Sequence, residues 1–135
     1  MQDKPSAEKL LAAARAFLND TAMPQLSGHA AFHARVAGNV LDILAREMEL
    51  APGFNRAETA RLESLLGESG TLKELNRKLC DKIASGEMDL SNDNLKTHLI
   101  MTTMGKLAID QPRYQGYISA QANLWPEEDS GEKIK

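Results

Sequence analysis

The histidines are the side chains in this chain best suited to binding a metal ion. His29 and His33 lie four residues apart, so on a helix their imidazoles would point the same way, and His98 is the only other histidine. The sequence has no HExxH segment and no second ligand pair at a matching spacing. Because a histidine on an apolar helix face is more often hydrogen-bonded structure than a ligand, we predict no metal site. These three histidines are the candidates if one exists.

Two charged residues occupy apolar positions of expected helices. Helical projection of residues 94–114 gives a segment apolar on nearly every side, with Lys106 beside Leu95 and Leu99. Glu47 falls on the apolar side of an earlier helix. Because a buried charge requires a partner, we predict that Lys106 is partly buried and forms an ion pair with Glu47, with Asp110 as the competing partner. The alternative is that Lys106 reaches solvent along its methylene groups.

Residues for covalent catalysis or nucleotide binding are not evident. Cys80, the single cysteine, sits at the border of an amphipathic stripe and is predicted to pack. The sequence lacks a GxSxG turn and both familiar phosphate loops, GxxxxGK[ST] and GxGxxG. We therefore assign no catalytic residue and no cofactor, and a non-catalytic protein is favoured over an enzyme.

Hydrophobic periodicity places these residues on helices and gives no β pattern. Ser6 is a good N-cap, Thr71 with Glu74 matches a capping box, and Pro52-Gly53 should break a long helix near Leu50. Asn55 is the expected cap of the next helix. The expected helices are 7–20, 28–50, 56–66, 72–85, 92–110 and a short one within 112–124. We predict an all-α fold, a single bundle of five or six helices over residues 1–125, followed by a polar tail, 126–135.

The same projection predicts which helix faces turn inward. On the second helix one face carries Val36, Val40, Ile43 and Leu44, and the opposite face carries Arg35, Asn39, Asp42, Arg46 and Glu49. We expect the apolar face to pack in the core. Gly105 should allow another helix to approach closely. In the last helix the residues expected to pack inward are Tyr114, Tyr117, Ile118 and Leu124.

Composition narrows the class of partner and the compartment. The chain has 135 residues and a formal net charge of -3, a balance that argues against nucleic acid as the main partner. Its longest weakly polar run is shorter than the roughly 20 residues that span a bilayer, so no membrane association is expected. The first residues lack the basic end and apolar core of a secretory signal. A cytoplasmic protein is the resulting expectation.

Three segments carry a resemblance to a known family: MQDKPSAEKLLAAARAFL, SGHAAFHARVAGNVLDILAREMEL and KLAIDQPRY. Together they resemble a bacterial family of small helical proteins catalogued as a domain of unknown function, over Met1 to about Tyr114. Members are encoded beside, or fused to, aminoglycoside-phosphotransferase-like kinases, commonly near acyl-CoA dehydrogenase genes. The resemblance implies an accessory protein for such a kinase and dehydrogenase. Its blocks FHARVAGN and KLAIDQPRY give candidate interaction residues: Phe32, His33, Arg35, Asn39, Lys106, Asp110, Arg113 and Tyr114.

Three hypotheses follow for the function. An accessory protein should carry an exposed patch for its partner. A small-ligand carrier should have an enclosed cavity near His33 and Lys106. An enzyme of unknown reaction would need a cleft lined by convergent polar groups. A homodimer through the apolar segment 94–114 is compatible with all three.

Overall fold

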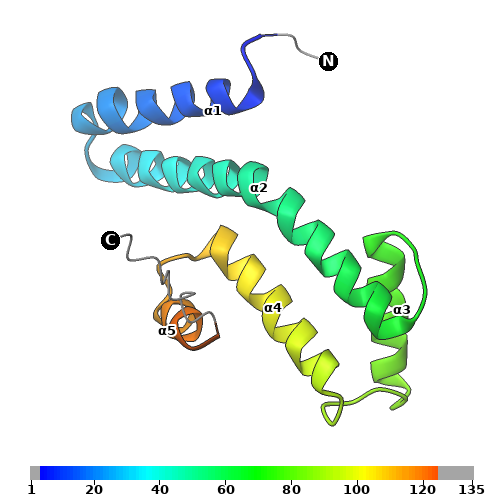
Figure 1. Cartoon of the computed structure of the whole chain (residues 1–135). Helices are drawn as coiled ribbons and strands as arrows, with labels where there is room; N and C mark the ends of the chain where they lie inside the picture. The colour runs from blue at the N-terminus through cyan, green and yellow to red at the C-terminus, as the bar shows by residue number, and fades with distance from the viewer. Residues whose placement is uncertain (1–3, 125–135) are drawn as a thin grey trace, which may run out of the picture. The chain divides into compact units, whose positions relative to one another are not determined.

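The computed structural model describes residues 4–124, which form five α-helices and no strand (Figure 1). The helices are α1 (Ala7–Ala16), α2 (Gly28–Leu66), α3 (Leu72–Ala84), α4 (Asp93–Asp110) and α5 (Gln115–Leu124). The predicted all-α fold is therefore confirmed, while the tail 126–135 lies outside the described residues. The chain groups into two compact units, Met1–Pro52 and Gly53–Lys135. The predicted boundary between a 1–125 domain and its tail stays a prediction.

The first unit pairs α1 with the first half of α2 (Figure 1). Ser6 caps α1 as predicted, its hydroxyl accepting from the Lys9 N–H at 3.4 Å. A wider π turn (Phe17–Ala22) and a 3-10 turn (Met23–Gln25) then lead to α2. Small residues of α2 lie on its buried side: Ala34 and Gly38 are buried, and a Cβ on Gly38 would lie 3.3 Å from Asn19 Oδ1. Close approach of the two backbones thus uses small side chains rather than large apolar ones.

The predicted break at Pro52-Gly53 is wrong, since α2 continues through both residues to Leu66. Pro52 has no N–H to donate to the Met48 carbonyl, but its fixed φ is a helical value. The residue proposed as the next N-cap, Asn55, lies inside the helix, where its carbonyl accepts from Thr59 Oγ1 at 2.8 Å. α2 ends at Leu66, the expected end of the 56–66 helix, and Gly67 follows with φ +72° and its N–H donating to the Glu63 carbonyl at 2.9 Å.

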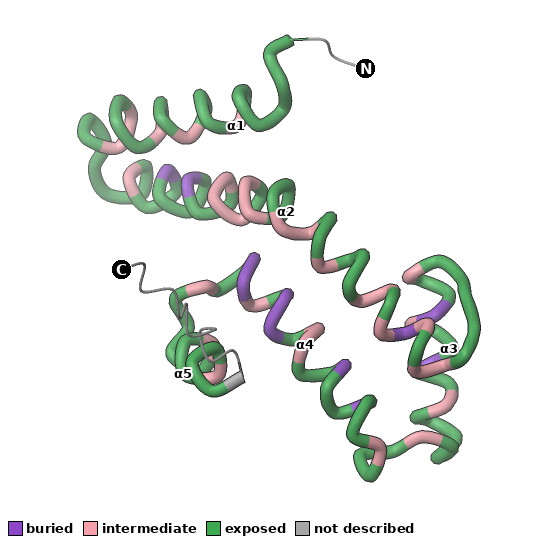
Figure 2. Tube along the Cα trace, viewed as in Figure 1, coloured by how far each residue is buried: buried purple, intermediate pink, exposed green. Residues whose placement is uncertain are grey.

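The core of the second unit is a cluster of leucines from α2, α3 and α4 (Figure 2). Leu62, Leu75, Leu79 and Leu95 are buried, with Leu65, Leu66, Leu72 and Met88 packed against them. On α3, Leu75 and Leu79 are buried in this cluster, whereas Ile83, one turn further on, is 40% exposed. Cys80 is also exposed, so its predicted packing role is wrong. It follows Leu79 directly and lies off the buried i, i+4 row of α3.

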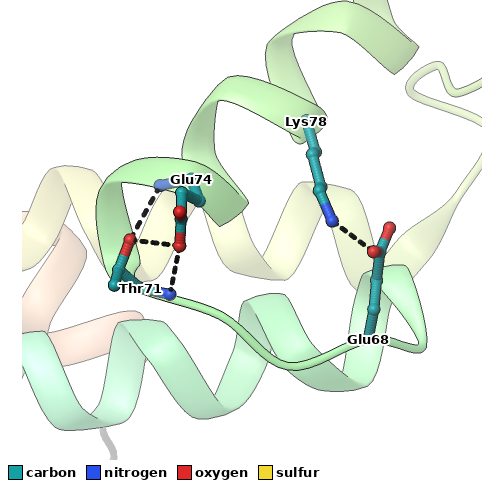
Figure 3. A network of polar contacts seen from close by, with 4 residues as sticks. All are labelled: Glu68, Thr71, Glu74 and Lys78. Atoms are coloured by element: carbon teal, nitrogen blue, oxygen red, sulfur yellow. Dashed lines mark hydrogen bonds and ion pairs between the residues drawn. The ribbon is translucent and has the colours of Figure 1, made fainter.

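The predicted capping box begins α3 and is shown in Figure 3. The Glu74 N–H donates to Thr71 Oγ1 at 3.3 Å, while the Thr71 N–H and hydroxyl donate to Glu74 Oε2 at 3.0 and 2.7 Å. These hydrogen bonds, the hydroxyl one foremost, lower the pKa of Glu74. Lys78 forms an ion pair with Glu68, in the loop before the helix (Figure 3). The box therefore fixes the turn between α2 and α3.

The fifth predicted helix is confirmed as α4, capped by Asn92, whose Oδ1 accepts from the Leu95 N–H at 3.1 Å. It ends at Asp110, and α5 begins at Gln115. The predicted inward packing at this end is wrong for Tyr114 and Ile118, which are 54% and 45% exposed. Tyr117 is half-buried, and the Leu124 side chain lies outside the description. The Tyr114 ring instead lies over Gly116, where a Cβ would come within 2.6 Å of its Cε1.

Candidate functional site

An apolar row on α2 is open to solvent. It consists of five residues at four-residue intervals, each 38–56% exposed, and is called the α2 face below: Phe32, Val36, Val40, Leu44 and Met48. The expectation that this face packs in the core is wrong, although Ile43 beside it is half-buried. The buried positions of this part of α2 are the small residues Ala34 and Gly38, so the large apolar residues lie on another side of the helix.

Polar candidates of the first block lie beside the α2 face. Arg35, Asn39 and Glu47 are all exposed, as are His29 and His33. The rings of His29 and His33 have centroids 6.2 Å apart, and Phe32 meets His33 edge-on at 5.5 Å. These are the mixed aromatic, cationic and apolar residue types that protein interfaces favour.

The structure adds no support to a metal site. His98 belongs to the second unit, so the first unit supplies two imidazoles, fewer than the three protein ligands of a catalytic zinc centre. Residues 4–124 contain no group of three or more histidine, cysteine or acidic side chains placed to hold an ion.

The second block of candidates forms a corner of the second unit, where α4 ends and the chain turns into α5. Lys106, Asp110, Arg113 and Tyr114 are all exposed, and we call them the α4–α5 corner. The Tyr114 N–H donates to the Gln111 carbonyl at 2.9 Å, which fixes the turn. With the ring seated over Gly116, the corner presents an aromatic surface between charged groups.

The prediction that Lys106 is the partly buried lysine is wrong. Lys106 is exposed, whereas Lys82 on α3 is half-buried and pairs with Glu87. α4 packs through Leu95, His98 and Gly105, where a Cβ would lie 3.3 Å from the Phe54 ring, so the predicted close approach at Gly105 is confirmed. Lys106, one residue further along the helix, is turned away from that contact.

The proposed pairing of Glu47 with Lys106 loses its physical basis, which was burial. Both side chains are exposed, and they belong to different units. Asp110, the alternative partner, is also exposed and follows Lys106 by one helical turn. Exposure of Lys106 agrees with the alternative that it reaches solvent, and its pairing with Glu47 stays a prediction.

A largely half-buried polar cluster inside the second unit was not predicted from the sequence. Glu58 Oε1 accepts from Asn76 Nδ2 at 2.8 Å, and Arg61 Nη2 lies 3.4 Å from Thr102 Oγ1. His98 is 2% exposed. Neither Arg61 Nε nor His98 Nδ1 has a hydrogen-bond partner among residues 4–124. The cluster thus joins α2, α3 and α4 through polar contacts next to the leucine core.

Burial is the main influence on His98. It lowers the pKa of the imidazole, the Arg61 guanidinium lowers it further, and the Glu58 carboxylate acts in the opposite direction. A lowered pKa keeps His98 neutral at pH 7, with one nitrogen able to accept a hydrogen bond. Sequence projection placed His98 at a helix edge. Its spacing of three from Leu95 was the available signal, but Arg61 lies on the part of α2 that was assigned to a separate helix.

A groove lies between α1 and α2 in the first unit. Its volume is about 400 Å³, and its lining residues are Glu8, Leu11, Ala12, Arg15, Ala45, Met48 and Glu49. Arg15 forms an ion pair with Asp42, and the carboxylates of Glu8 and Glu49 also line the groove. The expected cavity near His33 and Lys106 is not this one, because neither residue lines it.

The described residues form a small all-α protein whose two candidate blocks are exposed. The chain belongs to the family described as Domain of unknown function (DUF6285), whose model matches residues 24–114. That segment runs from the start of α2 to Tyr114, so it contains both candidate blocks and leaves out α1. No curated protein and no solved structure matches the chain. Within residues 4–124, none of the helices is both long and apolar enough to cross a membrane.

Proposed function

We propose that this protein is a non-catalytic interaction protein, an accessory subunit whose partner binds the α4–α5 corner. The observation that carries the proposal is exposure: all eight residues of the two candidate blocks lie at the surface, and the rings of Phe32 and Tyr114 are 56% and 54% exposed. Aromatic and arginine side chains are the types that dominate binding energy at protein interfaces. Residues whose role is to pack the core would be buried instead of exposed.

The chemistry of the corner indicates what a partner must provide. Arg113 calls for a carboxylate that can accept two parallel hydrogen bonds, and Tyr114 calls for an apolar pocket with an acceptor for its hydroxyl. Lys106 and Asp110 give the rim charges of both signs. The partners implied by the family resemblance are a phosphotransferase-like kinase and an acyl-CoA dehydrogenase, and a cytoplasmic location would suit both.

Binding of purified components tests the proposal. The protein is immobilised and exposed to the purified kinase and, separately, the dehydrogenase. Because Arg113→Glu reverses a charge that the partner must match, we expect it and Tyr114→Ala each to weaken binding about tenfold or more. Arg77→Glu makes the same charge change on the exposed surface of α3 and should bind like the wild type. Equal binding by Arg113→Glu and Arg77→Glu would place the partner elsewhere.

The groove between α1 and α2 favours a second candidate function, binding of a small ligand. Its volume of about 400 Å³ lies within the range of ligand pockets. Leu11, Ala12 and Met48 supply an apolar wall, and Glu8 with Glu49 supply negative charge. A ligand with an apolar body and a cationic group fits this lining. Native mass spectrometry of the purified protein tests it, with Ala45→Trp as the variant that fills the groove.

An enzyme of unknown reaction is the third candidate function. It is tested by pathway flux after His33→Ala and Lys106→Ala substitution in a folded protein. Unchanged flux would remove both residues as catalysts.

A further inference from the structure

We infer that the α2 face binds a second copy of this chain, with the two α2 helices antiparallel and crossing at Val40. The inference rests on the proposed function, because it assigns an occupant to one of the two exposed blocks of an interaction protein. It also moves the predicted homodimer contact from segment 94–114 to α2. In α4, the core of that segment, Leu95, Met104, Ala108 and Ile109 are buried.

Self-complementarity of the face is the first argument. About a twofold axis at Val40, residues at equal distances on either side of Val40 come opposite each other. Val36 and Leu44 are each four residues from Val40, so they face one another twice in the pair. Phe32 and Met48 lie eight residues from Val40, where the four-residue spacing has turned them toward opposite edges of the face, and Met48 also lines the groove beside α1. The three central apolar residues of the face thus meet apolar residues.

Charge is the second argument, and it selects the direction of pairing. His33 and Glu47 are each seven residues from Val40, and both are exposed beside the face. The antiparallel arrangement therefore places His33 of each protomer opposite Glu47 of the other. A parallel arrangement would instead place the two Glu47 carboxylates against each other, which is unfavourable.

Area is the third argument. At the observed exposures the five side chains present roughly 400 Å² on each protomer, the size of a patch that is often functional. Complete coverage of two such faces would remove at most roughly 800 Å² from water, about half of a standard interface of ~1,600 Å², so the flanking side chains must also take part. The flanking side chains of His29, His33, Arg35 and Glu47 are exposed and supply further contact.

Sedimentation equilibrium of the full chain at about 1–100 μM tests the pairing. We expect the wild type to form a dimer. Val40→Glu places two carboxylates together at the axis and should weaken the dimer ~100-fold, since such like-charge contact costs several kcal/mol. Ala60→Glu adds the same charge at an exposed position of the same helix and should leave the dimer intact. A monomeric wild type, or a Val40→Glu dimer as tight as the wild type, would overturn the inference.

Charge exchange tests the antiparallel register. His33→Glu and Glu47→Lys should each dimerise less tightly than the wild type. In an equimolar mixture of the two variants the introduced carboxylate faces the introduced ammonium group and His33 faces Glu47, so we expect a heterodimer tighter than either variant alone. No association in the mixture beyond that of the single variants would contradict the register.

The results also separate this inference from the proposed function. If the protein is a monomer that still binds the kinase or dehydrogenase, only the inferred dimer is contradicted. If it is a dimer that binds neither, only the accessory role is contradicted.

Discussion

His98 shows how one buried residue couples the fold to pH. The unfolded imidazole takes up a proton near pH 6.5, whereas burial and Arg61 hold the pKa of the folded one below its ordinary value. Between those two values the unfolded state binds more protons than the folded state. The stability that depends on neutral His98 is therefore fully present above about pH 6.5 and is lost as the pH falls below it.

Urea unfolding at several pH values between 8 and 5.5 measures this effect. We expect the free energy of unfolding of the wild type to decrease over that range. His98→Leu keeps a side chain of similar size and removes the titrating group, so its free energy of unfolding should change less. Parallel curves for the two proteins would show that His98 does not titrate differently on folding.

Two glycines in helices offer a matched comparison of side-chain space. A Cβ on Gly53 would have no neighbour within 4 Å, whereas one on Gly105 would meet the Phe54 ring at 3.3 Å. Alanine is favoured over glycine inside a helix by about 1 kcal/mol, so Gly53→Ala should stabilise the protein by about that amount. Gly105→Ala should stabilise the protein by less, because the Phe54 ring has to shift. Thermal unfolding of the two variants measures the difference, and equal gains would contradict close packing at Gly105.

Among the elements, the start of α3 depends on Thr71. Its hydroxyl accepts from the Glu74 N–H and donates to the Glu74 carboxylate. Thr71→Ala leaves the first turn without this cap and should lower the free energy of unfolding by about 1 kcal/mol. Ser69→Ala, in the exposed loop before it, is the control. If both variants unfold at the same denaturant concentration, the capping box contributes nothing measurable.

Local signals predicted these helix ends because they act within one turn. Ser6, Thr71, Asn92 and Gly67 each satisfy backbone groups of adjacent residues, so their roles could be recognised from sequence. The break at Pro52 was predicted wrongly because proline tolerance depends on the rest of the helix. The flanking turns of α2 hold it in the helix, and propensity is a weak guide against such context.

The candidate site was predictable as a set of residues but not as a surface. Periodicity grouped Val36, Val40 and Leu44 on one face, yet it could not tell which side of α2 would receive α1. The buried positions of this part of α2 are Ala34 and Gly38, small residues that contribute little to a hydrophobic pattern. The cluster of Arg61, Asn76 and His98 joins three helices, and no spacing within a single helix encodes it.

At the scale of the whole molecule, the two exposed blocks lie in different units, which suits two separate contacts. The α2 face lies in the unit Met1–Pro52, and the α4–α5 corner lies in the unit Gly53–Lys135. We expect Val40→Glu to reduce self-association without changing the affinity of the corner for a partner. Arg113→Glu should do the reverse. Affinity and oligomeric state measured on both variants check this independence, and loss of both properties in either variant would contradict it.

The most direct test of the accessory role is sedimentation velocity of the purified protein mixed with each candidate partner in turn. Our account predicts that the protein moves with the phosphotransferase-like kinase or the acyl-CoA dehydrogenase as one faster species of fixed stoichiometry. It also predicts that Arg113→Glu abolishes that species. Independent sedimentation of the protein and both candidates, at concentrations well above micromolar, would contradict the account.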